Sequence, residues 1–280
     1  MDLSETLVFL DGQKTKDPHL LVSKLRENET NVFETMRVYR LKIFRLDKHL
    51  DRLFASAKTI GISIPKTRES IKKELVSILR QIKNKREIFL RLMVMRGRTF
   101  VFVFHRSYPD RIYEEGVDLN TTVVKRNFSN AAPPEAKTGE FLSGILSVLD
   151  PSADGIFENL FLDRWGYLRE ARTANFFIVK NRCLKTPDAT GILDGVTRRF
   201  VIECATKEEI GVVETVLTRH DVWNADEAFL TNTSGGLVPV RSLDGRQIGM
   251  RAPGPVTVEL TRRFQIEYEL EIQKNSHASH

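Results

Sequence analysis

Short apolar segments that alternate with amphipathic helical segments constrain the fold of this chain more than any other feature of its sequence. Residues 32–39 and 43–46 have the composition of two strands around a short turn, and residues 88–95 and 100–104 have that of two buried strands. No segment offers the roughly 20 uninterrupted apolar residues that a membrane-spanning helix needs. The pattern therefore predicts a sheet and no membrane span.

Two helices are expected between these pairs of strands. The first carries apolar residues at helical spacing after Asp47, which we expect to cap the helix, and Gly61 is expected to end it. The second is expected over residues 68–82, with one apolar face. Helices that cover one side of a sheet in this way are typical of an α+β lobe.

The second half of the chain predicts more helices and strands after a Pro-rich loop. They are expected as helices at 140–149, 197–210 and from Pro255 onward, and as strands at 158–162, 167–169, 176–179, 212–216 and 228–230. We therefore expect two α/β lobes with a cleft between them. The expected division is a small domain over residues 1–117, an interdomain loop over 118–130 and a large domain over 131–280.

Composition limits the class of partner and the compartment. A net charge of +6 over 280 residues permits an anionic ligand but is too diffuse to indicate nucleic acid. The two cysteines, Cys183 and Cys204, do not form a disulfide framework and indicate a reducing, cytoplasmic location. No spacing of Cys and His residues predicts a metal site.

Two glycine-containing turns are candidates for binding a phosphate group. Gly195, Val196 and Thr197 lead into an expected helix, where free backbone N–H groups and the helix dipole favour an anion. A second turn contains Thr233 and follows the strand expected at 228–230. A plain helix cap and a plain turn are the ordinary alternatives, and the residues alone leave both open.

Lys137 and Glu170 are candidates for chemistry with a carbonyl compound. A lysine attacks a carbonyl only after losing its proton, which partial burial beside another cation promotes. Glu170 lies at the end of an expected strand, where a buried carboxylate needs a cationic partner. That partner can be a protonated ring nitrogen of a cofactor, or simply the neighbouring Arg169 or Arg172.

Three arginines complete the set of candidates. Arg37 lies on an expected strand and Arg52 on the first expected helix. Arg91 lies inside an apolar strand, where an unpaired charge is costly. Arg91 is therefore expected to meet either a carboxylate of the fold or an anionic ligand.

Together these residues resemble the class IV aminotransferases, the fold-type IV family of pyridoxal-phosphate enzymes. The blocks that carry the resemblance, in the family's order, are 33–37 (FETMR), 43–53 (IFRLDKHLDRL), 137–138 (KT), 170–177 (EARTANFF), 192–198 (ILDGVTR), 226–231 (DEAFLT), 238–240 (VPV), 244–246 (DGR) and 254–257 (GPVT). The resemblance covers nearly the whole chain. It implies a small N-terminal α/β lobe, a larger C-terminal lobe built on a pseudo-barrel, pyridoxal 5'-phosphate held between them, and a homodimer.

The resemblance also implies roles for individual residues. Lys137 matches the catalytic lysine that binds the cofactor covalently and moves the proton. Glu170 matches the acid that keeps the pyridine nitrogen of the cofactor protonated. The remaining cofactor-binding positions of the family match Arg52, Gly195, Val196, Thr197 and Thr233. Substrate binding is implied for Phe33, Arg37 and Arg91.

Some positions depart from the family pattern. Residues 29–31 read Glu-Thr-Asn where members usually carry Gly-Asp-Gly, and Glu140 and Phe141 replace an Asn and a Tyr. Such changes near the cofactor can alter the substrate or slow the chemistry. The Arg-x-His carboxylate trap of D-amino-acid aminotransferases has no counterpart after Gly97, whereas Arg37 and Arg91 favour a branched-chain enzyme.

The expected function is transfer of an amino group between a hydrophobic, branched-chain-type L-amino acid and 2-oxoglutarate. An alternative in the family is aminodeoxychorismate lyase, which releases p-aminobenzoate and pyruvate without an amino acceptor. The short connection over residues 97–109 and Asn232 resemble the lyases. A third hypothesis is a binding or regulatory protein on the same scaffold, which residues 29–31 suggest and the retained Lys137 and Glu170 argue against.

Overall fold

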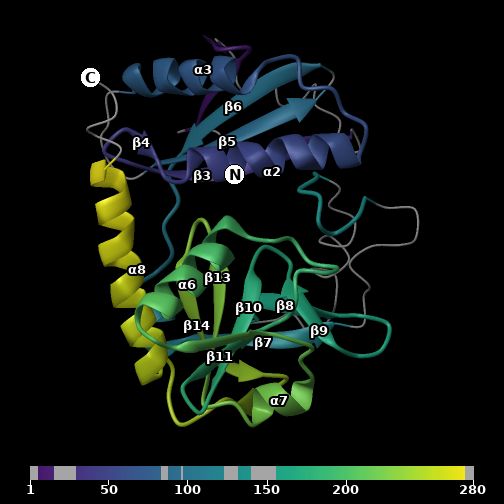
Figure 1. The fold of residues 1–280 in the computed structure, drawn as a ribbon, viewed down its shortest axis with the longest axis vertical. Coiled ribbons are helices and arrows are strands. Elements are labelled where there is room, and N and C mark those ends of the chain that lie inside the picture. Colours follow the sequence, from purple (N-terminus) through teal and green to yellow (C-terminus); the bar gives the residue numbers. More distant parts are fainter. Residues whose placement is uncertain are drawn as a thin grey trace. The chain divides into compact units, whose positions relative to one another are not determined.

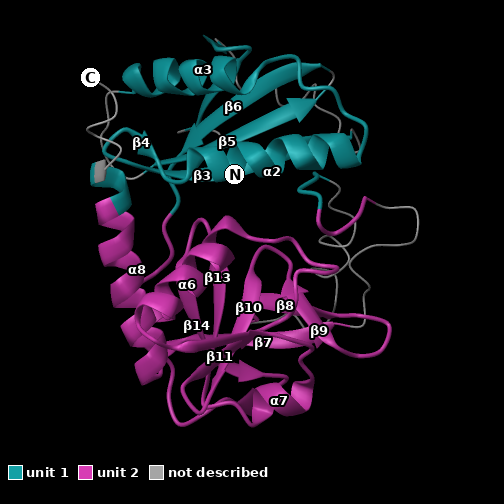
Figure 2. Cartoon of the chain, in the orientation of Figure 1, with its two compact units in different colours: residues 1–106, 136–140, 271–280 teal, residues 107–135, 141–270 magenta. Residues whose placement is uncertain are grey.

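The computed structural model describes residues 6–15, 30–82, 88–95, 97–122, 132–139 and 156–274. The chain divides into two compact units: residues 1–106, 136–140 and 271–280 form one, and residues 107–135 and 141–270 form the other (Figure 2). The helix expected over 140–149, with Glu140 and Phe141, lies outside the described residues, as does Glu29. No helix of the described part combines the length and the apolar character needed to cross a membrane.

The first unit is built on an antiparallel sheet with strand order β2-β1-β6-β5-β3-β4 (Figure 1). Its strands are β1 (Leu7–Leu10), β2 (Gln13–Lys14), β3 (Val32–Tyr39), β4 (Lys42–Ile43), β5 (Ile88–Met95) and β6 (Arg98–Phe104). β3 and β5 pair along their whole length, with Thr35 opposite Arg91. The strands predicted at 32–39 and 88–95 are thus confirmed, whereas the second strand of the first pair ends at Ile43 and not at residue 46.

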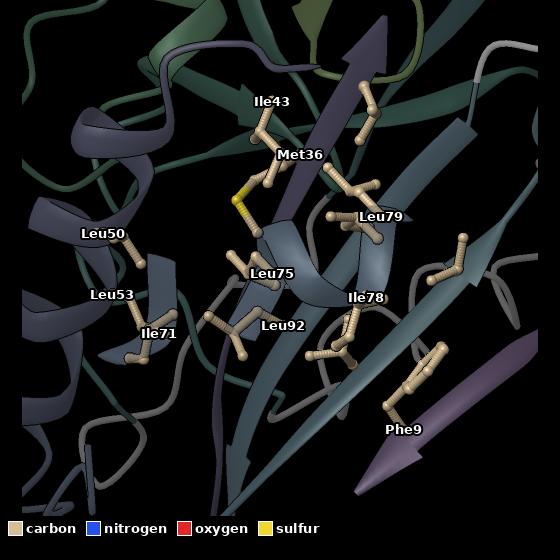
Figure 3. Close-up of a cluster of buried hydrophobic side chains, with 14 of the residues drawn as sticks. Phe9, Met36, Ile43, Leu50, Leu53, Ile71, Leu75, Ile78, Leu79 and Leu92 are labelled. Atoms are coloured by element: carbon tan, nitrogen blue, oxygen red, sulfur yellow. The ribbon is translucent and has the colours of Figure 1, made fainter. Parts of the chain in front are cut away.

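Helices α2 (Leu46–Thr59) and α3 (Arg68–Arg80) pack on one face of this sheet. Figure 3 shows the core between them, where Leu53 and Leu75 meet Met36 and Leu92 of the strands. All four side chains are buried, and each stabilises the unit by roughly 1.5–3 kcal/mol relative to its exposed state. The core explains the 3.6-residue period of the two helical segments, because only one side of each helix touches the sheet.

The start of α2 differs from the sequence prediction. Arg45, with a left-handed φ of 50°, occupies the N-cap position, and no side chain caps the helix. Asp47 lies one position inside the first turn, and its carboxylate pairs with Lys72 Nζ of α3 at 2.6 Å. The prediction that Asp47 caps the helix is therefore wrong. A carboxylate in the first turn still interacts favourably with the helix dipole.

Alternation along β3 sends successive side chains to opposite faces of the sheet. Glu34 and Met36 point to the face that α2 and α3 cover, whereas Phe33, Thr35 and Arg37 point to the other face. This alternation decides which candidate residues can meet.

The second unit contains a sheet that closes on itself. The strand order is β10-β13-β14-β7-β8-β9, and β9 pairs again with β10 through Glu170 and Asn175 (Figure 1). β11 and β12 extend the sheet beyond β10, and β15 pairs with β14. The strands are β7 (Val117–Thr122), β8 (Glu158–Leu162), β9 (Leu168–Ala171), β10 (Asn175–Lys180), β11 (Cys183–Thr186), β12 (Gly211–Glu214), β13 (Glu227–Asn232), β14 (Gly236–Leu243) and β15 (Arg246–Gln247).

This closed sheet encloses its own apolar core. Leu119, Leu160, Phe176, Leu230 and Val238 come from five different strands and are all fully buried in it. The unit also contains α4 (Arg111–Glu115), α6 (Val196–Lys207), α7 (Arg219–Trp223) and most of α8 (Pro255–Lys274). The predictions of an α+β fold and of a barrel in the C-terminal part are confirmed. Strand β7 occupies part of the segment expected as a loop over 118–130, while the division of the chain at 117 and 130 stays a prediction.

Candidate active site

Lys137 is held at the edge of β3 by backbone pairing. The Phe33 N–H donates to the Lys137 carbonyl at 3.2 Å, and the Gly139 N–H donates to the Asn31 carbonyl at 3.3 Å. Val32 and Thr138 form an antiparallel bridge between the two segments. The backbone of Lys137 is therefore fixed against the strand that carries Phe33, although about 100 residues separate the two in the sequence.

Two cations share the ring of Phe33. Lys137 Nζ lies 4.9 Å from the ring centre, and the Arg91 guanidinium carbon also lies 4.9 Å from it. The Lys137 N–H donates to the buried Ser56 hydroxyl of α2 at 3.0 Å. The first unit thus brings together Lys137, Phe33 and Arg91, three of the predicted site residues, around one aromatic ring.

Arg91 meets no carboxylate among the described residues. Its Nε lies 3.4 Å from the Thr35 hydroxyl, and its other contact is the Phe33 ring. Burial lowers the pKa of Arg91, and the nearby positive charge of Arg106 lowers it further. A half-buried guanidinium beside another cation attracts an anion, which leaves the second of the two sequence expectations for Arg91. Arg37 lies on the same face of β3, in register with Phe89 of β5.

On the helix-covered face, Glu34 forms a buried cluster with two residues of α2. Arg52 donates through Nε to Glu34 Oε1 at 2.7 Å and through Nη2 to Oε2 at 2.8 Å. His49 Nδ1 lies 2.7 Å from the same Oε2, and because a carboxylate only accepts, Nδ1 carries the proton. Burial alone would raise the pKa of Glu34, but the charge and hydrogen bonds of Arg52 and the His49 bond lower it to about 2. Arg52, predicted from the resemblance to hold phosphate, is thus anchored by Glu34.

The departure at Asn31 has a counterpart across the backbone bridge. A β-carbon added to Gly139 would lie 2.4 Å from the Asn31 side-chain amide. Asn31 is buried and fills the space that Gly139 leaves open. The larger residue at position 31 is therefore accommodated without moving the segment of Lys137.

In the second unit, Glu170 is fixed by neutral donors. The Leu193 N–H donates to Oε1 at 2.8 Å, and Asn175 Nδ2 donates to Oε2 at 3.1 Å. The carboxylate is 3% exposed and sits where β9 and β10 meet. Arg169 pairs with Asp163 instead, so the ordinary alternative of a salt bridge from Arg169 to Glu170 is wrong.

Asn175 ties this carboxylate to the start of α6. Its Nδ2 also donates to the Leu193 carbonyl at 2.8 Å, and a β-carbon on Gly195 would lie 2.2 Å from its Oδ1. Gly195 is the N-cap of α6, no side chain caps the helix, and Val196 and Thr197 begin it. The first N–H groups of α6 and the Thr197 hydroxyl are suited to an anion such as phosphate. Glu170, Gly195, Val196 and Thr197 thus form one connected arrangement.

Thr233 lies at the same end of the barrel, in the turn between β13 and β14. Asn232 Oδ1 accepts from the Gly235 N–H at 2.6 Å and shapes this turn. Thr231 lies directly opposite Asn175 on β13 and is buried, and its hydroxyl has no hydrogen-bond partner among the described residues. A buried hydroxyl of this kind is satisfied when a polar ligand binds.

The sequence analysis assigned no role to several of these residues. Asn175 and Glu34 were part of matching blocks, and His49, Ser56 and Thr231 were not singled out. Their common signal is a polar residue at a position where the strand or helix period demands burial. That signal marks a residue as structurally constrained without showing which partner it meets.

The matching family model is that of the amino-transferases of class IV, over residues 31–243. A Methanocaldococcus jannaschii protein, provisionally named a branched-chain-amino-acid aminotransferase, is 36% identical over 247 residues, which cover 84% of this chain and 85% of that protein. This chain therefore belongs to the class IV aminotransferases, and it is an enzyme of the transferase type.

Solved structures agree with the family. A branched-chain amino acid aminotransferase from the organism abbreviated T.th., with pyridoxamine 5'-phosphate, has a TM-score of 0.84 and 25% identity, covering 94% of this chain and 93% of that one. Its complex with N-(5'-phosphopyridoxyl)-L-glutamate also has a TM-score of 0.84. The branched-chain aminotransferase of Thermoproteus uzoniensis with norvaline has a TM-score of 0.82 and 28% identity and covers 96% of each chain.

The cofactor of this family is pyridoxal 5'-phosphate, and the residues present suit it. The uncapped start of α6 suits the phosphate, the buried carboxylate of Glu170 suits a protonated ring nitrogen, and the unsatisfied Thr231 hydroxyl suits a further polar group. Among the described residues, no group of three or more His, Cys, Asp or Glu side chains is arranged to hold a metal ion.

Proposed function

We propose that this aminotransferase moves an amino group between a hydrophobic, branched-chain-type L-amino acid and 2-oxoglutarate. The observation that carries the proposal is the Phe33 ring, which contacts both the Lys137 amine and the Arg91 guanidinium. A nucleophilic amine, an apolar surface and an anion-binding cation are the three features that a hydrophobic amino acid requires of its site.

Arg91 is the proposed carboxylate-binding residue, with Arg37 on the same face of the sheet as a second candidate. Their neighbours on that face include the aromatic and aliphatic side chains of Phe33, Phe89 and Met93. The solved relatives bound to norvaline and to an L-glutamate adduct support an aliphatic amino acid and a dicarboxylic one as the two substrates.

Lys137 is the proposed catalytic residue. Its Nζ binds the cofactor covalently, is displaced by the incoming amino group, and then takes a proton from the substrate α-carbon and delivers it to the cofactor carbon. Pyridoxal phosphate supplies the electron sink that makes this α-proton acidic. The Ser56 and Phe33 contacts fix the Lys137 backbone, so that only the side chain moves during the transfer.

The other proposed cofactor contacts come from both units. Glu170 keeps a proton on the ring nitrogen, and its two neutral donors hold its carboxylate in place for that bond. The phosphate is assigned to the start of α6 with Gly195, Val196 and Thr197, together with Thr233 and Arg52.

We also propose that the enzyme is a homodimer in the cytoplasm, with the domain division at residues 117 and 130 given above. The dimer is a property that the family resemblance implies. The compartment is supported by Cys183 and Cys204, both of which are free.

The substrate proposal is tested by assaying the full-length enzyme with single amino donors and 2-oxoglutarate. We expect L-leucine, L-isoleucine or L-valine to yield L-glutamate at a rate that Lys137→Ala abolishes. Release of pyruvate from aminodeoxychorismate without a keto acid, and no L-glutamate from any donor, would identify the lyase instead. Binding of the cofactor without either activity would favour the non-catalytic hypothesis.

A further inference from the structure

We propose that Glu34 and His49 are positioning residues, which hold the Arg52 guanidinium in the orientation that binds the cofactor phosphate. The inference rests on the proposed function, because it takes pyridoxal phosphate as the ligand of Arg52. Neither residue is proposed to touch the cofactor, and both act through Arg52.

The cluster has the geometry of a fixed mount. His49, Arg52 and Ser56 are spaced by three and four residues along α2 and so lie on one face of it. Arg52 reaches both oxygens of Glu34, one through Nε and one through Nη2, at 2.7 and 2.8 Å. A two-point contact of this kind fixes the plane of the guanidinium, which a single hydrogen bond does not.

Arg52 lies at the outer side of this cluster. The side chains of Glu34 and His49 are 0% and 2% exposed, whereas that of Arg52 is 13% exposed. The contact with Glu34 uses two of the five N–H donors that an arginine carries. The guanidinium can therefore bond a phosphate oxygen while it stays attached to Glu34.

His49 supports the carboxylate from the buried side. Its Nδ1 donates to the same Glu34 oxygen that accepts from Arg52 Nη2. Burial lowers the pKa of His49, and this outweighs the Glu34 carboxylate, which raises it, so that the ring is a neutral donor. Without this donor the buried carboxylate loses a hydrogen bond to its charged form and is no longer fixed on that side.

The same face of α2 also holds the lysine. Ser56 accepts from the Lys137 N–H, and the positive charge of Lys137 contributes to lowering the pKa of His49, so the two groups are close. Arg52 and the Lys137 backbone thus share one support. A shift of Arg52 on α2 changes its placement relative to Lys137, and hence the distance from the bound phosphate to the reactive amine.

The test compares how tightly the full-length apoprotein binds pyridoxal phosphate and pyridoxal, which has the same ring and aldehyde but no phosphate. For His49→Leu we expect the ratio of the two affinities to fall about tenfold, because a hydrogen bond to a charged group is worth a factor of that order. His49→Asn places an amide nitrogen near the position of Nδ1 and is expected to restore most of the ratio.

Two variants on α2 serve as matched controls. Leu53→Val removes one buried methylene group and no polar group, and Lys58→Ala changes an exposed side chain at the end of the helix. Both are expected to keep the wild-type ratio. If His49→Leu fails to fold, Glu34→Gln replaces it, because it keeps the shape of the side chain and removes the charge, and the same tenfold fall is expected.

The possible failures are distinguishable. A wild-type protein that does not bind pyridoxal phosphate overturns the proposed function and this inference with it. A wild-type preference for the phosphate that persists in His49→Leu or Glu34→Gln overturns the positioning role alone. A fall of equal size in Leu53→Val shows a loss of packing and overturns the positioning role as well.

Discussion

The carboxylate of Glu34 is buried beneath α2, yet the structure keeps it ionised. The positive charge of Arg52 and the donors from Arg52 and His49 outweigh the cost of burial and lower its pKa from an ordinary 4.5 to about 2. A group whose pKa is lower in the folded state binds its proton more readily after unfolding. Its contribution to stability is therefore complete above about pH 5 and is lost as the pH falls from 4.5 toward 2.

We expect Glu34→Gln to remove this pH dependence. For the wild-type apoprotein, the shift corresponds to about 3 kcal/mol of unfolding free energy lost between pH 6 and pH 2 through this group. Urea unfolding of wild type and variant at pH 6, 4 and 3 measures the difference. Equal slopes of unfolding free energy against pH in the two proteins would show that Glu34 is not ionised and paired as described.

Arg91 is the second residue whose environment makes a prediction. Because its guanidinium meets a hydroxyl and a ring but no carboxylate among the described residues, we expect Arg91→Met to weaken substrate recognition. The expected loss in kcat/KM for 2-oxoglutarate is about 10- to 100-fold, the value of a hydrogen bond to a charged group. Arg98→Met, which removes an exposed arginine paired with Asp11, is the control and should leave kcat/KM unchanged. Equal kinetics in the two variants would remove Arg91 from the site.

At the scale of elements, the start of α6 depends on one close approach. The backbone of Gly195 leaves room for Asn175, and the same asparagine holds Glu170. Any side chain at position 195 therefore disturbs the carboxylate and the helix start together. The coupling links the ring-binding and phosphate-binding parts of the proposed cofactor site.

We predict that Gly195→Ala destabilises the protein by about 1–3 kcal/mol, the usual cost of overpacking, and weakens cofactor binding. Gly211→Ala is a matched control, because a β-carbon there would lie 3.6 Å from Cys183 Sγ, an ordinary contact. Unfolding free energies and cofactor affinities of the two variants give the comparison. If Gly195→Ala binds the cofactor as tightly as Gly211→Ala, the close approach has no functional weight.

The elements that could be predicted from the sequence are those with a clear period. β3, β5 and the two helices of the first unit bury one face each, so their apolar residues recur at fixed spacing. β7 was missed because Val117 and Leu119 are its only large apolar residues, and it pairs in parallel with β8 and β14, without a hairpin turn to mark it.

The candidate site was predictable in part, through the resemblance. It identified Lys137, Glu170 and the start of α6, but not the contacts that fix them. Those contacts join residues far apart in the chain, such as Phe33 with Lys137 and Glu170 with Leu193. Local patterns carry no information about such pairs. For the same reason Arg52 could be assigned to the phosphate without any sign of its anchor on Glu34.

For the whole molecule, the proposal assigns one cofactor to residues of both compact units. A ligand that binds only the folded protein stabilises every segment whose opening releases it, by about 2.7 kcal/mol at 100 times its Kd. We therefore predict that pyridoxal phosphate slows amide hydrogen exchange both along β3 and at the start of α6. Protection confined to one unit would contradict a cofactor that contacts both.

The measurement that tests the central claim most directly is the absorption spectrum of the full-length protein loaded with pyridoxal phosphate, before and after adding single amino acids without a keto acid. We predict that L-leucine and L-glutamate each abolish the band of the lysine-bound cofactor and produce pyridoxamine phosphate. D-alanine should leave the band in place, and Lys137→Ala should lack it from the start. A band that no L-amino acid changes would contradict the account.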